Sequence, residues 1–226
     1  MRSNRTLLFV SAILLFSLSA CLGPQKINKW VARHYQDEPS DAPKRKNEQI
    51  TVSSKLPDMG VHLSETEKNT SHVLPLIFYW QYDYKNTCTL NPQLPVNNFT
   101  AAVNAYAGHG LKQKLKDNRL ELTVEQIPHV FAIDDKGHII WVIYAFGWDY
   151  LTIQPATSNL VVSYRVLSAG NAEIKHGTIT IADIDKGMSL KMLQSLKKMT
   201  WQYLQQYDAN ITVMSKKVID QLASEL

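Results

Sequence analysis

The sequence predicts an α+β protein, with an antiparallel-rich sheet of about five to six strands and two main helices packed on one face. Three observations predict this class. Runs rich in aromatic and β-branched residues alternate with polar ones, two pairs of apolar runs flank turn residues, and two stretches repeat apolar residues every three or four positions. The helical stretches lie at about 98–117 and 189–224, so the order is strand, helix, several strands, helix.

Four stretches between and beside the helices predict the strands. Residues 73–84 are rich in aromatic residues, and 119–127 alternates between apolar and charged residues as a half-buried strand does. Residues 130–146 and 160–181 each read as two apolar runs separated by a glycine-containing turn, which predicts two hairpins. In the first of them Gly137 is expected to supply the left-handed residue of the turn.

The two helical stretches differ in regularity. In 98–117, Asn98 is the expected N-cap, whereas Gly108 and Gly110 interrupt the pattern and indicate close packing or a break. In 189–224 an apolar stripe runs the whole length without a proline. Burial of the stripe against the sheet is favoured over a coiled-coil seam with a partner, because sustained charges at the flanking heptad positions are lacking.

Composition excludes several classes of protein. The 226 residues are 45% hydrophobic and 19% charged, as in globular proteins. The formal charge is +4 for the whole sequence and 22 − 20 = +2 for residues 21–226, which is too weak to favour nucleic-acid binding. Two cysteines can form neither a disulfide scaffold nor a four-cysteine zinc site. The seven histidines show no metal-ligand spacing, and we expect no metal and no cofactor.

The first residues carry the most specific pattern. A short basic segment precedes the uncharged apolar stretch Leu7–Leu18, which is too short to span a bilayer. The sequence Leu18-Ser19-Ala20-Cys21 follows, and it resembles the lipobox of bacterial lipoproteins. The resemblance implies cleavage between Ala20 and Cys21, a diacylglycerol on the Cys21 sulfur, and a fatty acyl group, such as palmitate, on the new amino terminus.

The resemblance also implies a location. The protein is expected in the bacterial cell envelope, facing the periplasm and bound to a membrane through lipidated Cys21, with two or three acyl chains for stable anchoring. Leu22 follows the cysteine where an inner-membrane lipoprotein of this kind carries Asp, which favours the outer membrane. Cys88 is then the only free thiol, and we expect it to be packed as a small hydrophobic residue.

The sequence divides into a cleaved segment 1–20, a lipidated and mostly disordered tether 21–72, and a single α+β domain 73–226. Within the tether, 26–35 has an apolar helical face and basic residues off that face. Two interpretations stay open: a helix lying in the membrane interface, and a segment outside the membrane that is either a short helix docked on the domain or a disordered stretch. Residues 36–72 are charged and proline-containing, which predicts a solvated linker with at most a short strand at its end.

Two aromatic ladders are the unusual feature of the domain. Every second residue is aromatic over two strand segments, so the rings of each ladder share one face. The ladders consist of Phe78, Trp80, Tyr82 and Tyr84, and of Tyr144, Phe146, Trp148 and Tyr150. They are either core and cross-strand pairs or an exposed platform for glycan, acyl chains or a protein partner.

No established catalytic motif is present. His129, which is near Asp134 and Asp135 in the sequence, is a conceivable acid–base group, for example with Asp134 or Asp149. The sequence therefore favours a non-catalytic, lipid-anchored envelope lipoprotein that binds a protein or cell-wall partner. One alternative is an auxiliary lipoprotein or carrier for lipid or amphiphile transport across the envelope. A second alternative is an enzyme with an unrecognised site. The sequence does not determine the oligomeric state.

Overall fold

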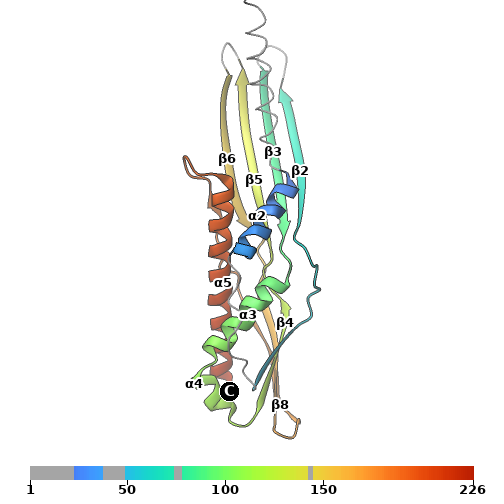
Figure 1. Cartoon of the computed structure of the whole chain (residues 1–226), viewed down its shortest axis with the longest axis vertical. Helices are drawn as coiled ribbons and strands as arrows, with labels where there is room; N and C mark the ends of the chain where they lie inside the picture. The colour runs from blue at the N-terminus through green and yellow to red at the C-terminus, as the bar shows by residue number, and fades with distance from the viewer. Residues whose placement is uncertain (1–22, 38–48, 74–77, 142–144) are drawn as a thin grey trace, which may run out of the picture.

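A computed structural model of the chain describes residues 23–37, 49–73, 78–141 and 145–226. It is an elongated α+β molecule in which the helices lie on one side of two sheets (Figure 1). The helices are α2 (Pro24–Asp37), α3 (Gln93–Tyr106), α4 (His109–Leu115) and α5 (Leu196–Glu225). The strands are β1 (Ile50–Ser54), β2 (Leu63–Val73), β3 (Phe78–Thr89), β4 (Arg119–Gln126), β5 (Val130–Trp141), β6 (Ala145–Pro155), β7 (Leu160–Leu167), β8 (Glu173–Ile181) and β9 (Met188–Ser189).

The strands form two sheets where the sequence predicts one. The four-stranded sheet has the order β1-β4-β7-β8, with β1 parallel to β4 and the other pairs antiparallel. The five-stranded sheet has the order β2-β3-β5-β6-β9 and is antiparallel throughout. The α+β class is thus confirmed, and the single sheet is corrected to two.

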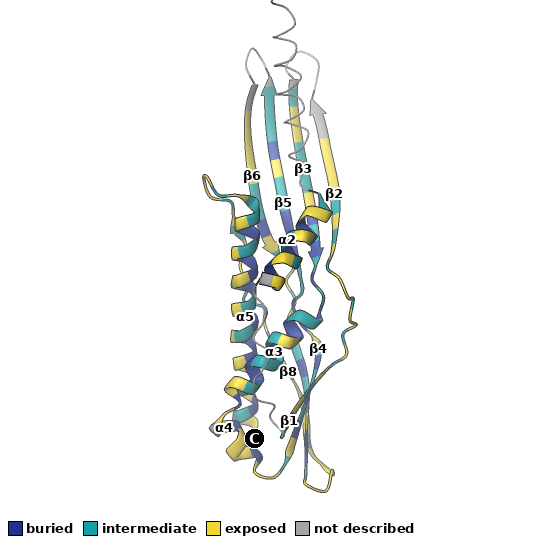
Figure 2. Cartoon of the chain, in the orientation of Figure 1, coloured by how far each residue is buried: buried dark blue, intermediate teal, exposed yellow. Residues whose placement is uncertain are grey.

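The hydrophobic core lies between the helices and the sheets. Figure 2 shows that α5 is buried along the side that faces the strands. The apolar stripe of the C-terminal stretch provides this side, so the prediction that it is core is confirmed. Its fully or nearly fully buried members include Leu204, Tyr207, Ile211, Met214, Val218 and Leu222.

Both predicted helices differ from the expectation at their ends. The first stretch forms two helices, α3 and α4, that are separated at Gly108, and Asn98 lies inside α3 instead of capping it. The second begins only at Leu196, because the Ser195 hydroxyl accepts a hydrogen bond from the Lys198 backbone N–H (3.2 Å) and caps the helix there. Leu193, expected on the buried stripe, precedes the helix and is fully exposed.

The hairpin predicted at 160–181 is present as β7 and β8. The hairpin predicted within 130–146 is not formed as expected, because β5 pairs along its length with β6, which begins at Ala145. Residues 130–141 form one continuous strand, so the predicted turn at Asp134–His138 was wrong. Gly137 pairs with Tyr82 and Asp149 in the middle of the sheet and does not have a positive φ. In the β7–β8 turn, the left-handed residue is Asn171 (φ 61°).

The segment predicted as a disordered tether contributes three elements to the fold: α2, β1 and β2. Helix α2 docks on the domain, with Ile27 and Val31 fully buried. The Trp201 indole N–H donates to the Trp30 carbonyl (3.0 Å), and the Tyr35 hydroxyl donates to Asp208 (3.3 Å). Of the two interpretations of 26–35, the structure supports the helix that packs on the domain. The apolar face is used for this packing and is not available to a membrane.

Replacement of Ile27 by alanine should lower the free energy of unfolding by about 2–5 kcal/mol, because the change leaves a cavity under α2. Lys29→Ala, at an exposed position of the same helix, is the matched control and should change it by less than about 0.5 kcal/mol. Equilibrium urea denaturation measures both values. Equal, negligible effects of the two variants would show that α2 does not pack on the domain.

Candidate functional site

The five-stranded sheet continues past the ends of α2 and α5, as Figure 1 shows. We call this part, residues 68–73, 78–84, 135–141 and 145–151, the sheet extension. In Figure 2 the extension is mostly intermediate or exposed, whereas the part of the sheet beneath the helices is rich in buried residues. The extension is therefore a large surface that the domain's own helices leave open.

Strand register defines two faces of the extension. Asn86, Ile133 and Ile153 are adjacent on β3, β5 and β6, and all three are buried, so they mark the inner face that the helices cover. Moving two residues at a time from this row keeps the same face. Tyr82 and Asp149 therefore lie on the inner face, and the intervening positions lie on the outer face.

This register places the two aromatic ladders on opposite faces. Trp80, Tyr82 and Tyr84 lie on the inner face, and Trp148 and Tyr150 lie on the outer face. Of the other predicted ladder residues, Tyr144 lies outside the described residues, and the structure describes the backbone of Phe78 and Phe146 but not their side chains. The ladders are partly open to solvent, with Trp80 exposed to 41%, Trp148 to 43% and Tyr150 to 63%. They form neither a closed core nor one continuous platform.

The outer face carries a row of three rings that crosses three strands. The His138 imidazole stacks between Tyr79 and Trp148, with ring centroids 5.9 and 5.3 Å apart. The Tyr79 hydroxyl and the His138 Nδ1 are hydrogen-bonded at 2.6 Å. Sequence reasoning missed Tyr79 and His138, because their contact depends on how β3 and β5 pair and not on any spacing within one strand.

The inner face holds a tyrosine against a carboxylate. The Tyr82 hydroxyl donates to Asp149 Oδ1 (2.6 Å) across Gly137, which lies between them on β5. A Cβ at position 137 would collide with the Tyr82 ring and lie 2.6 Å from Asp149 Oδ1. Glycine is thus required here for close approach of side chains. Burial, followed by the hydrogen bond to Asp149, raises the pKa of Tyr82 and keeps it protonated.

An open groove of about 580 Å³ adjoins this pair. One wall consists of Tyr82 on β3, Asp135 on β5 and residues 149–152 of the edge of β6; the other is the segment 189–194. The volume of the groove is typical of a small-molecule site. Its walls contain carboxylates as well as aromatic and apolar groups, so it is not a purely apolar cavity. Burial, with a smaller contribution from the charge of Asp149, raises the pKa of Asp135.

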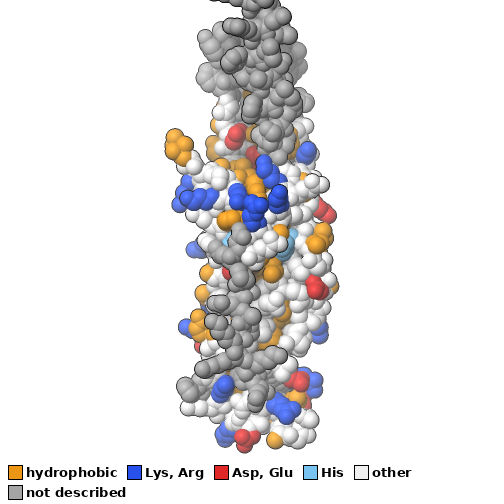
Figure 3. Space-filling view, viewed as in Figure 1, with side chains coloured by type: hydrophobic (Ala, Val, Ile, Leu, Met, Phe, Trp, Pro, Cys, Tyr) orange, Lys and Arg blue, Asp and Glu red, His pale blue; other side chains and the backbone are white. Residues whose placement is uncertain are grey.

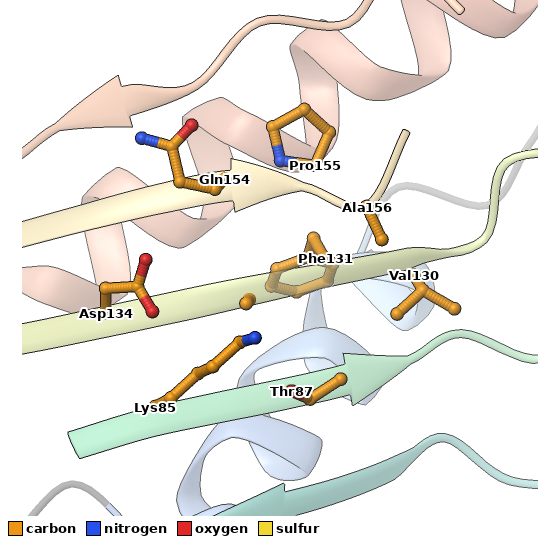
Figure 4. A pocket seen from close by; sticks show the side chains of 9 residues that line it. Lys85, Thr87, Val130, Phe131, Asp134, Gln154, Pro155 and Ala156 are labelled. Carbon is orange, nitrogen blue, oxygen red and sulfur yellow. The ribbon is translucent and has the colours of Figure 1, made fainter. Parts of the chain in front are cut away.

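A smaller hollow of about 180 Å³ lies on β3, β5 and β6 at the base of the extension. Figure 4 shows side chains of the three neighbouring strands around it, among them Lys85, Asp134 and Gln154. Lys85 and Asp134 belong to the outer face by register. The hollow therefore adds apolar side chains as well as Lys85, Asp134 and Gln154 to the surface next to the ring row.

The acid–base residues considered from the sequence do not come together. Asp134 and Asp149 lie on opposite faces of the sheet, and the His129 Nδ1 is hydrogen-bonded to the Ile127 carbonyl (2.8 Å). Among the described residues, no group of three or more His, Cys, Asp or Glu side chains is placed to hold a metal ion. Cys88 is fully buried, as expected from the sequence, and burial raises the pKa of its thiol to about 11.

The predicted lipidation residues, Ala20 and Cys21, lie outside the described residues. Within the described part of the chain, no helix combines the length and apolar character that a bilayer crossing requires. Comparison of the chain with known protein families, with curated proteins and with solved structures gives no significant match. The function is therefore argued from this chain's own geometry.

Replacement of Gly137 by alanine should lower the free energy of unfolding by about 1–3 kcal/mol, because the added methyl group displaces Tyr82 from Asp149. Gly110→Ala is the control of opposite sign. No atom lies within 4 Å of that Cβ position in α4, and alanine there should stabilise the helix by up to about 1 kcal/mol. Thermal unfolding compares them. A neutral Gly137→Ala would contradict the close contact across the inner face.

The raised pKa of Asp135 predicts a pH-dependent effect on stability. The folded chain binds this proton more tightly than the unfolded chain, so ionised Asp135 costs stability at neutral pH and the cost disappears as pH falls toward 3.8. Asp135→Asn should therefore be more stable than the wild type at pH 7, with an advantage that shrinks on acidification. Urea denaturation across this range measures it, with Asp134→Asn on the opposite face as control. A constant difference at all pH values would refute the assignment.

Proposed function

We propose that this chain is a lipid-anchored lipoprotein of the bacterial envelope that performs no catalysis and binds a partner through the outer face of the sheet extension. The partner is an envelope protein or cell-wall glycan. The lipobox-like sequence at Leu18–Cys21 supports the anchor, and Leu22 after the cysteine supports the outer membrane. The signal peptide is removed, and the domain works on the periplasmic side.

One observation carries the partner-binding part of this proposal: the helices stop short of the sheet, and the extension is left with large aromatic side chains in solvent. A domain that needed these rings only for stability would cover them, because burial of aromatic surface is strongly favourable. Exposed clusters of this kind mark interaction sites, and Trp and Tyr are enriched in the centres of interfaces.

The outer face is suited to this role because its ring row is held in place before a partner arrives. His138 is fixed between two rings and by the hydrogen bond to Tyr79, so these side chains lose little conformational freedom on binding. The Lys136 ammonium and the Asp83 carboxylate form an ion pair on the same face (3.1 Å). Ring faces bordered by charged and amide groups suit a glycan or the polar rim of a protein interface.

The alternatives receive less support. A carrier of lipids or other amphiphiles needs an apolar cavity, and the groove of the inner face includes Asp135 and Asp149 in its wall. An enzyme needs titratable groups that converge on one position, and the residues considered for this role are separated by the sheet.

A photo-reactive phenylalanine analogue in place of Tyr150 tests the proposal in intact cells. We expect an adduct that is several-fold more abundant than the adduct from the same analogue at Ile174, a similarly exposed position on β8. Trp148→Ala in the same chain should remove most of the adduct, because it deletes the ring beside His138. Digestion of the adduct by a protease or by a cell-wall hydrolase distinguishes a protein from a glycan.

Cys21→Ser provides the control for the anchor. The substituted chain should fractionate away from membranes and give less adduct, because the domain is no longer concentrated at the envelope. Adducts at Tyr150 no more abundant than at Ile174 would refute partner binding on this face. Membrane association that persists in Cys21→Ser would refute the anchor alone.

A further inference from the structure

The connection between β9 and α5 exposes two apolar side chains at its apex. Met192 is 93% exposed and Leu193 is 99% exposed. Leu193 has a φ of 64°, a left-handed conformation that a leucine adopts only at a cost in strain. The turn is nevertheless well defined, because Gln194 accepts from the Lys191 N–H through its side chain and donates its own N–H to the Lys191 carbonyl, each at 3.0 Å.

Basic side chains surround this apex and continue onto α2. The exposed basic residues of α2 are Lys26, Lys29 and Arg33. Around the loop and the first turn of α5, Lys191 and Lys198 are exposed and Lys197 is half-buried. Figure 3 shows Lys and Arg side chains gathered over α2 and, on the same face, beside the upper end of α5. No acidic residue occupies the first turn of either helix, where the helix dipole would favour one.

Ring contacts join the two basic groups into one surface. The Lys197 ammonium lies over the Trp201 ring, 4.2 Å from its centroid, and the Trp201 indole donates to the Trp30 carbonyl. The Lys26 ammonium lies 5.7 Å from the centroid of the Trp30 ring. Since Trp30 contacts Trp201 and Tyr35 contacts Asp208, the helices run in the same direction, and their N-termini lie at the same end.

We propose that the N-terminal ends of α2 and α5, together with Met192 and Leu193, form a docking surface for a membrane that contains anionic phospholipid. The basic side chains and the two helix N-termini face the phosphate groups, and the apolar apex enters the interface. The inference goes beyond partner binding and relies on the proposed anchor only for the position of the bilayer. Pro24 lies three positions after Cys21, and an extended chain of that length spans at most about 11 Å.

Docking on this side leaves the outer face of the extension turned away from the bilayer. The helices and the groove lie on the inner side of the five-stranded sheet, and the His138 ring row lies on the other. Asp135 and Asp149 also face the inner side, within the groove, and six basic side chains around the apex and on α2 outnumber them. The row of Tyr79, His138 and Trp148 is therefore separate from the docking surface, whereas Tyr150, at the edge of β6, lines the groove together with Met192 and Leu193.

The test uses the full, lipidated protein from its own envelope, reconstituted in vesicles of phosphatidylcholine alone or with phosphatidylglycerol. Met192→Cys carries an environment-sensitive fluorophore, and Cys88 stays unlabelled because it is fully buried with a raised pKa. A nitroxide-bearing lipid should quench this fluorophore several-fold more in the anionic vesicles than in the neutral ones. The same label at Ile174→Cys, on β8, should be quenched weakly in both.

Two variants should reduce the quenching at position 192 to the level of the Ile174 control. Leu193→Asp places a charge at the apex, and the triple change Lys26→Gln, Lys29→Gln and Arg33→Gln removes the charge of α2 from exposed positions. Circular dichroism verifies that both variants remain folded.

Flotation of the vesicles separates the two proposals. If the protein floats with neutral vesicles, the lipid anchor is present. If the label at position 192 is then quenched no more in anionic vesicles than in neutral ones, the docking surface is refuted. A chain with an unmodified thiol at Cys21 refutes the anchor, and quenching at 192 in anionic vesicles would then still support docking. Docking is refuted if neither variant reduces the quenching at position 192. It is also refuted if an added acidic protein, but not anionic vesicles, changes the fluorescence of the label.

Discussion

The packing of α2 on the domain is the constraint from which the rest of the arrangement follows. Ile27 and Val31 are fully buried, and Asp208 on α5 accepts hydrogen bonds from Tyr35 of α2 and from Asn98 of α3. One carboxylate thus holds three helices together. Helix α2 begins at Pro24, only three positions after Cys21. The proposed anchor on Cys21 would therefore hold the domain close to the membrane.

The second organising feature is the unequal length of the two layers. The strands of the five-stranded sheet are up to 12 residues long, and the helices cover only part of them. Beneath the helices the inner face is core; beyond them the same face holds Tyr82, Asp149 and a groove. The outer face there carries the ring row of Tyr79, His138 and Trp148. A single sheet therefore packs against the helices at one end and presents two partly exposed faces at the other.

Sequence patterns predicted what depends on neighbours along the chain. The stripe of α5, the alternation of β4 and the β7–β8 hairpin are local, and each is present. Patterns failed where pairing between distant segments decides the result. Parallel pairing of β1 with β4 turns part of an apparent linker into a strand, and close approach of Tyr82 explains a glycine that looks like a turn residue. The two aromatic ladders have the same spacing, yet register alone determines that they face opposite ways.

The buried thiol of Cys88 has a consequence for how the folded protein responds to oxidants. Its side chain is inaccessible, and with a pKa of about 11 almost none of it is present as thiolate at neutral pH. Oxidants and mixed disulfides react with the thiolate, so a chain carrying this one cysteine in its domain neither cross-links to other copies nor becomes a substrate for disulfide-forming enzymes. Once folded, the domain protects this thiol from oxidation by burial alone.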